Sequence, residues 1–463
     1  MAKNGKVARA AYRCAECGME VPKWVGRCPE CQAWGTIEER GVAAPVTKIA
    51  AGAPSSPARS ITAIAASETA VTKTGIEELD RVLGGGIVPG AVVLLAGEPG
   101  VGKSTLLLEV VHQWARGNGT ALYVTGEESA GQVRLRAERT GALHDRMYLA
   151  AESELSAVLG HVDTVAPSLL ILDSVQTVAS AEVDGVPGGV TQVRAVTAAL
   201  VALAKERGLP VVLVGHVTKE GSIAGPRVLE HLVDAVLQFE GDRHSTLRLL
   251  RGVKNRFGAA DEVGCFELVA GGIDGVADPS GLFVSRHTEA APGTAVTVVV
   301  EGKRPMLAEV QALVAPSTLA NPRRACSGLD SARVAMVLAV TEKRCGVQLG
   351  SSDVYTATVG GMKVREPAAD LAVALAIASA AKDIELPADL VALGEVGLVG
   401  EVRRVPDISR RLAEAVRLGF TKALVPPDCG EIPAGIKALP VSSMGEVMDV
   451  VRRVSAKAAA KRK

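Results

Sequence analysis

GEPGVGKS, at residues 97–104, is a complete phosphate-binding loop of the form G-x-x-x-x-G-K-[ST]. The apolar run VVLLA precedes it at residues 92–96, and the run TLLLE follows it at residues 105–109. A strand, a glycine loop and a helix in this order surround a phosphate with backbone N–H groups and the positive end of the helix. The order therefore predicts a site for a nucleoside triphosphate.

The side chains of this loop have predicted roles of their own. Lys103 is expected to neutralise the β- and γ-phosphates, and the Ser104 hydroxyl is expected to complete the shell of a Mg²⁺ ion. ATP and Mg²⁺ are therefore the predicted cofactors of this part of the chain. The predicted nucleotide contacts are Gly97, Glu98, Pro99, Gly100, Val101, Gly102, Lys103, Ser104 and Thr105.

Two further strands are expected to carry acidic groups to the nucleotide. The run LLILDS at residues 169–174 brings an apolar strand to Asp173, which is placed to hold Mg²⁺. The run LYVTGEES at residues 122–129 brings a second strand to Glu127 and Glu128. We predict Glu127 as the general base for the attacking water and Glu128 as the alternative. The competing interpretation is that either residue only caps the following helix.

His216 follows the apolar run of residues 210–214 and is a candidate sensor of the γ-phosphate. A polar group at the end of this strand could relay the state of the nucleotide to the segment behind it. The alternative is a structural histidine with no part in sensing. We expect mobile loops at residues 218–227 and at residues 184–192.

The composition of the 463 residues favours α/β domains. Apolar residues make up 48% of the chain but aromatic residues only 3%, so the cores are expected to be aliphatic, as in buried parallel sheets. The formal net charge is zero, so any nucleic-acid surface has to be local. No apolar run approaches the ~20 residues of a membrane span, and no secretory signal is visible. We expect a cytoplasmic protein without a membrane partner.

The length predicts about three domains of roughly 150 residues each. We assign residues 10–36 to a cysteine ribbon, residues 37–68 to a flexible linker and residues 69–284 to a phosphate-loop domain. Residues 285–455 are assigned to a C-terminal α/β domain and residues 456–463 to a basic, frayed tail. The phosphate-loop domain is expected to place strands and helices around a mostly parallel sheet. Its predicted strands are residues 92–96, 120–125, 169–172, 210–214, 247–250 and 265–269. The C-terminal domain has predicted strands at 294–301, 311–314 and 389–393, and helices at 330–340, 367–382 and 409–418.

Four of the eight cysteines crowd into the first 31 residues, namely Cys14, Cys17, Cys28 and Cys31. Two C-x-x-C pairs, ten residues apart, have the spacing of a tetrahedral Zn²⁺ site. A module of this size has too little core to fold alone, so Zn²⁺ is predicted as a structural cofactor. Trp24 and Trp34 either contact a partner protein or nucleic-acid base, together with Lys23 and Arg27, or pack the small core.

The run KNRFG occupies a predicted tight turn between two strands. The functional interpretation is a finger that reaches a neighbour's nucleotide or a nucleic-acid phosphate. The alternative is a solvated basic turn. The residues concerned are Lys254, Asn255, Arg256, Phe257 and Gly258.

The order of these parts resembles the bacterial RadA (Sms) family of RecA-like DNA recombination proteins. The likeness rests on the four-cysteine ribbon, the run TGIEELDRVLGGG at residues 74–86, GEPGVGKST, YVTGEES and KNRFG, and it covers essentially the whole chain. It implies a hexameric ring ATPase that acts on single-stranded and branched DNA. Such a ring would drive branch migration alongside the RecA recombinase, with helicase-like translocation. The resemblance also favours the sensing role of His216 and implies that Lys254 and Arg256 act at subunit contacts, in nucleotide response and DNA engagement.

The C-terminal domain resembles the proteolytic domain of Lon-type proteases, which use a Ser–Lys dyad. The runs GGMKVREPAADL at residues 360–371 and GEVGLVGEVR at residues 394–403 carry the likeness. The alignment places Ala369 at the nucleophile position and Ser409 at the lysine position, so no proteolysis is expected. The domain is expected to assemble the ring. Basic residues available for DNA are predicted to be Lys363, Arg365, Arg403, Arg404, Arg410 and Arg411.

Other function classes compete with the DNA motor. The main alternative is a RecA/KaiC-like regulatory ATPase acting on protein partners, because YVTGEES also resembles the clock-type KaiC proteins. Dependence of ATP hydrolysis on DNA separates the two. An ATP-dependent protease is disfavoured by Ala369 and Ser409, and a scaffold without enzymatic activity is disfavoured by the set of Lys103, Glu127 and Asp173.

Overall fold

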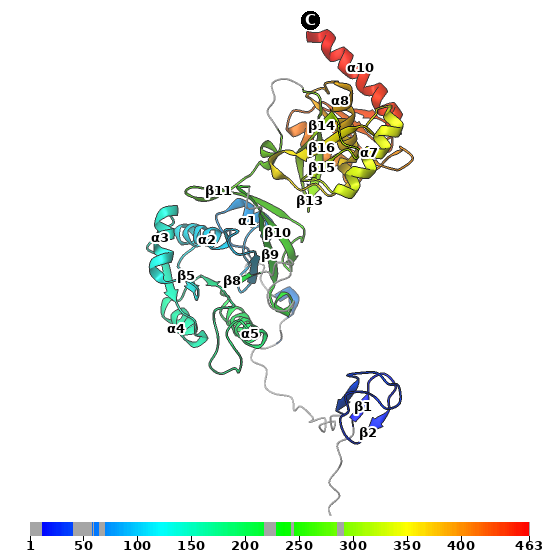
Figure 1. Cartoon of the computed structure of the whole chain (residues 1–463). Helices are drawn as coiled ribbons and strands as arrows, with labels where there is room; N and C mark the ends of the chain where they lie inside the picture. The colour runs from blue at the N-terminus through cyan, green and yellow to red at the C-terminus, as the bar shows by residue number, and fades with distance from the viewer. Residues whose placement is uncertain are drawn as a thin grey trace, which may run out of the picture. The chain divides into compact units, whose positions relative to one another are not determined.

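The computed structural model describes residues 12–39, 58, 60–63, 70–216, 228–241, 245–284 and 291–462 (Figure 1). The chain divides into two compact units, Met1–Ala65 and Ala66–Lys463. The loop predicted at residues 218–227 lies outside the described residues, and so does most of the predicted linker.

The cysteine ribbon is a small antiparallel sheet. Its strands β1 (Tyr12–Cys14), β2 (Glu20–Val21) and β3 (Ile37–Glu39) have the order β2-β1-β3. The buried cluster between them consists of Cys14, Val21, Cys28 and Ile37. A short 3₁₀ turn, η1 (Ile61–Ala63), is the other described element of this unit. Half of the buried cluster is cysteine, so the ribbon has little apolar core of its own.

A nine-stranded sheet forms the centre of the phosphate-loop domain, in the order β12-β11-β10-β9-β4-β8-β7-β5-β6. The strands from β6 to β9 in this order pair in parallel, and β10, β11 and β12 pair antiparallel. This confirms the predicted α/β class with a mostly parallel sheet. The strands are β4 (Val92–Gly97), β5 (Ala121–Thr125), β6 (Met147–Ala151), β7 (Leu169–Asp173), β8 (Val211–His216), β9 (Ala235–Gly241), β10 (Leu247–Asn255), β11 (Val263–Val269) and β12 (Gly272–Gly275).

Helices cover both faces of this sheet because successive strand residues point to opposite sides. Val93 and Leu95 of β4 belong to one buried cluster, with residues of α2, whereas Val92 and Leu94 belong to a second cluster, with residues of α4 and α5. The described helices of the domain are α1 (Glu77–Leu83), α2 (Lys103–Gly117), α3 (Ala130–Thr140), α4 (Leu155–Val165), α5 (Val190–Arg207) and α6 (Val228–Leu232).

The prediction of a mobile loop at residues 184–192 is wrong for the last residues of this range. Helix α5 begins at Val190, and Gln192 within it is buried. The Gln192 side chain accepts a hydrogen bond from Ser180 N at 2.9 Å and donates to the carbonyl oxygens of Ser180 and Val183. One buried amide thus holds the segment that precedes the helix.

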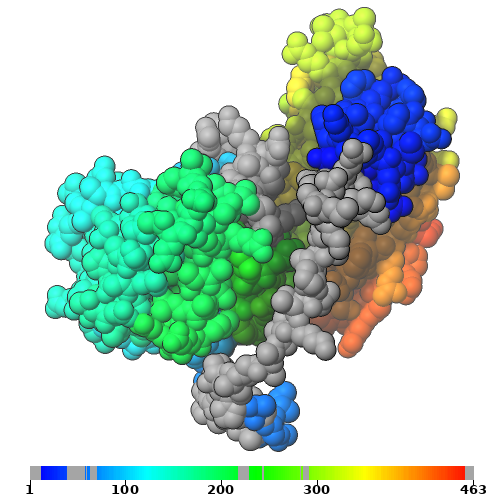
Figure 2. Space-filling view, turned by 90° about the horizontal axis from the view of Figure 1, so that it is seen from below, coloured from blue at the N-terminus to red at the C-terminus, as the bar shows by residue number. Residues whose placement is uncertain are grey.

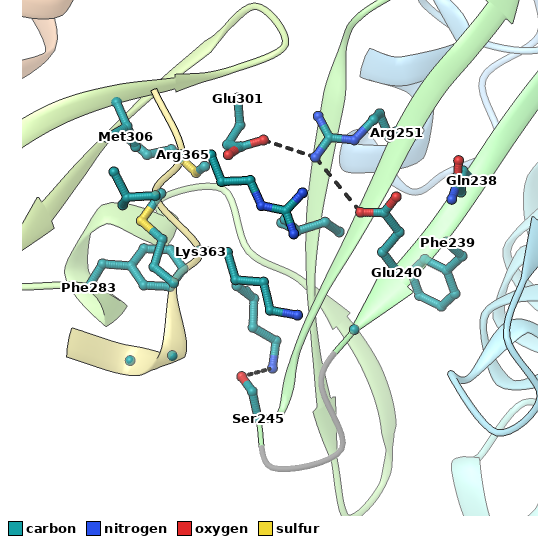
Figure 3. Close-up of a pocket in the computed structure, with 18 of the residues that line it drawn as sticks. Gln238, Phe239, Glu240, Ser245, Arg251, Phe283, Glu301, Met306, Lys363 and Arg365 are labelled. Carbon is teal, nitrogen blue, oxygen red and sulfur yellow. Dashed lines mark hydrogen bonds and ion pairs between the residues drawn. The ribbon is translucent and has the colours of Figure 1, made fainter. Parts of the chain in front are cut away.

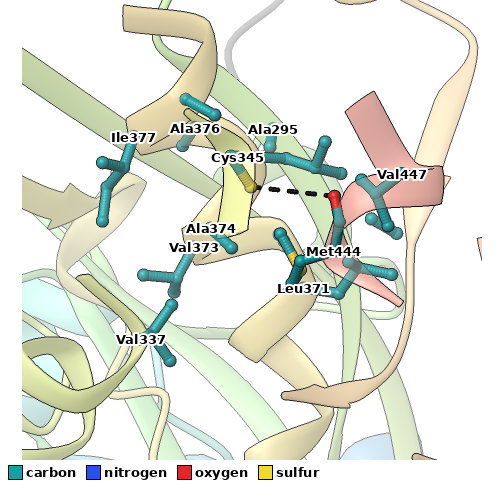
Figure 4. Packing of buried hydrophobic residues seen from close by; sticks show 14 of the residues in the cluster. Ala295, Val337, Cys345, Leu371, Val373, Ala374, Ala376, Ile377, Met444 and Val447 are labelled. Atoms are coloured by element: carbon teal, nitrogen blue, oxygen red, sulfur yellow. Dashed lines mark hydrogen bonds between the residues drawn. The ribbon is translucent and has the colours of Figure 1, made fainter. Parts of the chain in front are cut away.

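The C-terminal domain contains a seven-stranded mixed sheet in the order β15-β16-β14-β13-β17-β20-β21, and a two-stranded hairpin. Its largest buried cluster packs the alanine-rich helix α8 against α7 and the start of α10 (Figure 4). The basic tail predicted as frayed belongs instead to helix α10. The elements are β13 (Thr294–Glu301), β14 (Arg304–Pro316), β15 (Arg324–Ser327), α7 (Ser331–Cys345), β16 (Ser352–Thr358), η4 (Val359–Gly361), η5 (Pro367–Ala369), α8 (Asp370–Lys382), β17 (Leu390–Ala392), β18 (Glu395–Val396), β19 (Val402–Arg403), α9 (Ile408–Arg417), β20 (Lys422–Val425), β21 (Lys437–Pro440) and α10 (Met444–Arg462).

The phosphate-loop domain and the C-terminal domain meet through a buried ion pair. Arg304 at the start of β14 contacts the carboxylate of Glu78 in α1, and both side chains are buried. Glu78 also accepts a hydrogen bond from Cys265 N at 2.8 Å, and Arg304 donates to Ala277 O at 2.6 Å. In the space-filling view the green residues that follow β8 adjoin the yellow and orange residues of the C-terminal domain (Figure 2).

Candidate nucleotide and metal sites

The phosphate loop has the predicted strand–loop–helix form. It leaves the sheet at Gly97 and enters α2 at Lys103, with positive φ angles of 79° at Gly100 and 111° at Gly102. A Cβ atom at Gly97 would lie 2.5 Å from the Phe239 carbonyl oxygen, so only glycine fits at this position. Lys103 Nζ donates to the carbonyl oxygens of Gly97 at 2.8 Å and of Glu98 at 3.0 Å. Burial lowers the pKa of this ammonium group.

Ser104 and Asp173, the predicted Mg²⁺ ligands, are in direct contact. Ser104 Oγ donates to Asp173 Oδ2 at 2.7 Å, and the Tyr123 hydroxyl donates to the same oxygen at 2.6 Å. Oxygen atoms of this kind are the ligands that Mg²⁺ prefers. Sequence reasoning missed Tyr123, although a tyrosine in a buried strand needs a partner for its hydroxyl. Burial raises the pKa of Tyr123 well above its ordinary value, so it stays a donor.

Glu127 and His216 form the next part of the same site. His216 Nε2 lies 2.8 Å from Glu127 Oε1, and Ser174 Oγ donates to that oxygen at 2.6 Å. His216 Nδ1 lies 3.5 Å from Lys103 Nζ, so the histidine links the acid to the phosphate loop. Burial raises the pKa of Glu127, but the hydrogen bonds from His216 and Ser174 outweigh it and lower the pKa overall.

Glu128 is held elsewhere. Its carboxylate accepts two hydrogen bonds from Arg136 Nη2, at 2.6 and 2.8 Å. The helix cap at this point is Ser129, whose side chain accepts from Gln132 N. The interpretation that Glu127 or Glu128 caps α3 is therefore wrong, and Glu127 is the one of the two that contacts His216.

The KNRFG segment begins in β10 and contacts its own chain. Lys254 Nζ donates to Glu230 O at 2.6 Å and to Val233 O at 2.7 Å, at the carboxyl end of α6. Asn255 Nδ2 donates to Leu83 O at 3.1 Å, at the end of α1. Arg256 pairs with the buried Asp234 at 3.2 Å.

Phe257 and Gly258 complete this turn. The Phe257 ring is partly exposed, and Lys205 Nζ lies 5.9 Å from its centroid. A Cβ atom at Gly258 would lie 3.2 Å from Gly84 Cα, so the turn packs closely on the end of α1. Lys254 and Asn255 hold the ends of α6 and α1, whereas Arg256 and Phe257 are exposed, so both the finger and the solvated turn remain predictions for this segment.

Four cysteines form the metal site that their spacing predicts, and their ligand atoms all lie within 4.8 Å of one another. The Sγ atoms of Cys14 and Cys31 are 3.6 Å apart, and so are those of Cys17 and Cys28. Tetrahedral Zn²⁺ with Zn–S bonds of ~2.3 Å requires sulfur atoms ~3.8 Å apart. The arrangement fits a closed, structural zinc site.

The two ribbon tryptophans are exposed, Trp24 by 61% and Trp34 by 74%, so the interpretation that they pack the core is wrong. A Cβ atom at Gly26 would lie 3.8 Å from atoms of both rings, so both rings are close to this glycine. The Arg27 guanidinium lies 5.7 Å from the centroid of Trp34. An exposed aromatic and cationic face results.

The two positions that align with the Ser–Lys dyad of Lon-type proteases hold neither a serine nucleophile nor a lysine. Ala369 is buried in an apolar cluster, and Ser409 Oγ donates to the Glu431 carbonyl oxygen. One residue of the predicted DNA set is corrected: Arg411 is buried and pairs with Glu366 at 2.6 and 2.8 Å, so it is not available for DNA. Arg410 is exposed.

No helix in the described part of the chain is long and apolar enough to cross a membrane. Three family models match the chain: AAA domain at residues 58–222, Rubredoxin metal binding domain at residues 12–39, and Subunit ChlI of Mg-chelatase at residues 352–429. The solved KaiC-like protein PH0186 from Pyrococcus horikoshii aligns with 45% of this chain and 99% of its own, at 21% identity and a TM-score of 0.37.

Curated relatives match nearly the whole chain. The DNA repair protein RadA of Mycolicibacterium smegmatis is 58% identical over 460 residues, 97% of this chain and 98% of the relative. The DNA repair protein RadA of Streptococcus pyogenes serotype M1 is 47% identical over 448 residues, 96% and 99% of the two chains. With its zinc ribbon, phosphate loop and Lon-like domain, this chain belongs to the RadA family of DNA repair proteins.

Proposed function

We propose that this chain is a DNA-dependent ATPase of recombinational repair. It binds single-stranded DNA and uses ATP hydrolysis to drive branch migration and helicase-like processing of recombination intermediates alongside the RecA recombinase. The observation that carries the ATPase is the meeting of Lys103, the Ser104–Asp173 pair and the Glu127–His216 pair at the carboxyl ends of neighbouring strands. Substrate chemistry in open α/β sheets takes place at this edge.

Each residue of the site has one task in hydrolysis. Lys103 and the loop N–H groups hold the β- and γ-phosphates. Glu127 accepts a proton from water as the water oxygen bonds to the γ-phosphorus and the bond to the bridging oxygen breaks, which leaves ADP and inorganic phosphate. The lowered pKa keeps Glu127 ionised for this step at neutral pH. Mg²⁺, held through Ser104 and Asp173, supplies neutralisation of phosphate charge when it is bound.

His216 connects hydrolysis to the rest of the domain. An arriving γ-phosphate competes for Lys103 Nζ, which lies 3.5 Å from His216 Nδ1, and so changes the partners of the histidine. Helix α6 is the next described element after His216, and carbonyl groups at its end accept from Lys254. We infer that nucleotide state reaches Lys254 and Arg256 along this route and that these residues act at the subunit contacts of a hexameric ring.

The DNA part of the proposal rests on the family. The curated relatives carry the name DNA repair protein, and this chain covers nearly their full length. Exposed basic residues on the C-terminal domain, among them Lys363, Arg365 and Arg410, offer phosphate contacts.

A regulatory ATPase acting on protein partners is the second candidate. The exposed pair of Trp24 and Trp34 favours it, because exposed aromatic rings are common at protein interfaces. The same rings also suit stacking on bases, so the pair alone does not separate the two functions.

Steady-state ATP hydrolysis, measured with and without single-stranded DNA, tests the proposal. Lys103→Ala serves as the blank, because it removes the phosphate ligand. Stimulation by DNA in the wild type supports the DNA motor and leads to branch migration on a labelled three-way junction. Basal turnover that DNA leaves unchanged would contradict it and favour the regulatory ATPase.

A further inference from the structure

The Asp173 carboxylate is buried at the carboxyl end of β7, and the groups that bind it directly are neutral. Ser104 Oγ and the Tyr123 hydroxyl both donate to its Oδ2 atom, at 2.7 and 2.6 Å. Among the residues that the structure describes, none forms an ion pair with this carboxylate. A buried carboxylate normally pairs with a cation or binds a metal ion. The arrangement therefore points to a bound cation.

Other carboxylates near the phosphate loop already have partners. In the cavity that borders the loop, Arg251 Nη2 lies 2.9 Å from Glu301 Oε2 and 3.9 Å from Glu240 Oε2 (Figure 3). The Glu127 carboxylate accepts from a serine hydroxyl at 2.6 Å and lies 2.8 Å from a histidine nitrogen. Asp173 differs from these acids because its partners are hydroxyl groups alone.

The donor set of Ser104 and Asp173 fits Mg²⁺. Ser104 lies in the first turn of α2 and gives its one hydroxyl hydrogen to Asp173, so the lone pairs of its Oγ atom stay available for a cation. Mg²⁺ requires oxygen ligands in nearly ideal octahedral geometry, whereas the larger Ca²⁺ accepts flexible arrangements. A site that prefers Mg²⁺ therefore needs a carboxylate with a fixed orientation.

The register of β5 and β7 brings the Tyr123 side chain to this carboxylate. Tyr123 is paired with Ile171, and Thr125 is paired with Asp173. Tyr123 and Ile171 belong to the same buried cluster, together with residues of α2. Asp173 is two residues beyond Ile171 and so faces the same side of the sheet. The long tyrosine side chain spans this diagonal, and its hydroxyl meets the carboxylate.

Packing alone does not require the hydroxyl of Tyr123. A phenylalanine ring would fill the same buried place in β5, and burying a hydroxyl group costs free energy unless the group is hydrogen-bonded. The hydroxyl spends its hydrogen on Asp173 Oδ2. Asp173 Oδ1 accepts no hydrogen bond from the described residues, so one oxygen is held and the other stays available.

We propose that Tyr123 is a positioning residue that fixes the Asp173 carboxylate and gives the site its preference for Mg²⁺ over the larger Ca²⁺. The proposal rests on the proposed function, because it takes the phosphate loop as an ATP site. Tyr123 acts through Asp173 and has no direct part in hydrolysis. Since β5 also leads to Glu127, one strand positions both the carboxylate for the cation and the general base.

Equilibrium titration of the full chain with the non-hydrolysable β,γ-imido analogue of ATP tests this role. Each variant is titrated in Mg²⁺, in Ca²⁺ and in EDTA, and its melting temperature is measured alongside. Tyr123→Phe removes the hydroxyl and keeps the ring, so the packing of β5 is retained. Tyr148→Phe is the matched control, because it makes the same change at an exposed position of the adjacent strand β6.

Loss of a group that holds a metal ligand typically lowers metal affinity at least tenfold. The factor by which Mg²⁺ raises the affinity for the analogue should therefore fall about tenfold in Tyr123→Phe. The factor for Ca²⁺ should fall by less, and the affinity in EDTA should stay unchanged. Tyr148→Phe should match the wild type in all three solutions.

Two results would overturn the role of Tyr123. One is equal weakening in Mg²⁺, Ca²⁺ and EDTA, which indicates a purely structural tyrosine, and the other is an unchanged Mg²⁺ factor. Failure of the proposed function gives a different result. A wild type whose hydrolysis ignores DNA refutes the DNA motor, but a reduced Mg²⁺ factor in Tyr123→Phe still supports the positioning role.

Discussion

Glu127 and Glu128 are adjacent in sequence, but different groups hold their carboxylates. Glu127 contacts His216 and Ser174 beside the phosphate loop, whereas Arg136 holds Glu128. We predict that Glu127→Gln lowers kcat for ATP hydrolysis about 10²- to 10⁴-fold, because an amide cannot accept the proton of water. ATP affinity should stay close to that of the wild type. Steady-state phosphate release measures kcat and nucleotide titration measures the ATP affinity, with Glu128→Gln as the matched control. An equal loss of turnover in Glu128→Gln would contradict the assignment of Glu127 as the general base.

The hydrogen bonds to Glu127 also make a pH-dependent contribution to stability. They lower its pKa below the ordinary value of 4.5. A lowered folded pKa stabilises the fold above the unfolded pKa, and this stabilisation is lost as the pH falls through the folded pKa. The wild type should therefore exceed Glu127→Gln in free energy of unfolding by a constant amount from neutral pH down to about pH 4.5, and by less below it. Urea titrations at several pH values measure this difference, and a difference that persists unchanged at the lowest pH would be evidence against it.

At the scale of helices and strands, what could be read from sequence depended on burial. Strands β4, β7 and β8 are buried throughout most of their length, and their apolar runs predict them well. Strand β6 was missed although its sequence, MYLAA, is apolar. It lies at the edge of the sheet and most of its residues are not buried, and a short apolar run alone does not identify an edge strand. The role of Gln192 was missed as well, because a helical glutamine gives no sign that it holds the preceding loop.

Lys254 shows how a basic side chain can act through a helix. Its ammonium donates to two carbonyl groups at the end of α6, and α6 is the next described element after His216. We predict that Lys254→Ala reduces the stimulation of hydrolysis by DNA several-fold while ATP affinity is retained, because the carbonyl groups lose their donor and α6 its position. DNA-stimulated hydrolysis and nucleotide titration are compared in the same preparation. Equal loss of both, with a lower melting temperature, would indicate a folding defect instead.

At the scale of the whole molecule, the cysteine ribbon belongs to a different compact unit from the phosphate loop. Zinc supplies most of the folding energy of such a small module. Cys28→Ser should therefore release zinc and unfold the ribbon, while basal hydrolysis and the main thermal transition of the larger unit stay unchanged. Zinc released to a chromogenic chelator, hydrolysis and calorimetry measure the three effects. Complete loss of basal hydrolysis would refute the independence of the two units.

The Glu78–Arg304 ion pair joins the two domains of the larger unit, and no sequence pattern reveals it, since 226 residues separate the partners. Both charges are buried, so removing Arg304 leaves the Glu78 carboxylate in a medium of low polarity with Arg81, at 3.5 Å, as its remaining ion-pair partner. We predict that Arg304→Met destabilises the unit by about 3–5 kcal/mol.

The double variant Glu78→Gln/Arg304→Met tests the cause of that loss. The glutamine oxygen can still accept from Cys265 N, whose bond to Glu78 measures 2.8 Å, and no charge remains buried. Much of the lost stability should therefore return. Urea unfolding of the wild type, both single variants and the double variant forms a thermodynamic cycle that isolates the coupling. Additive effects would show that the pair does not couple the domains, whereas strong coupling means that the pair stabilises the Lon-like domain and the phosphate-loop domain against unfolding together.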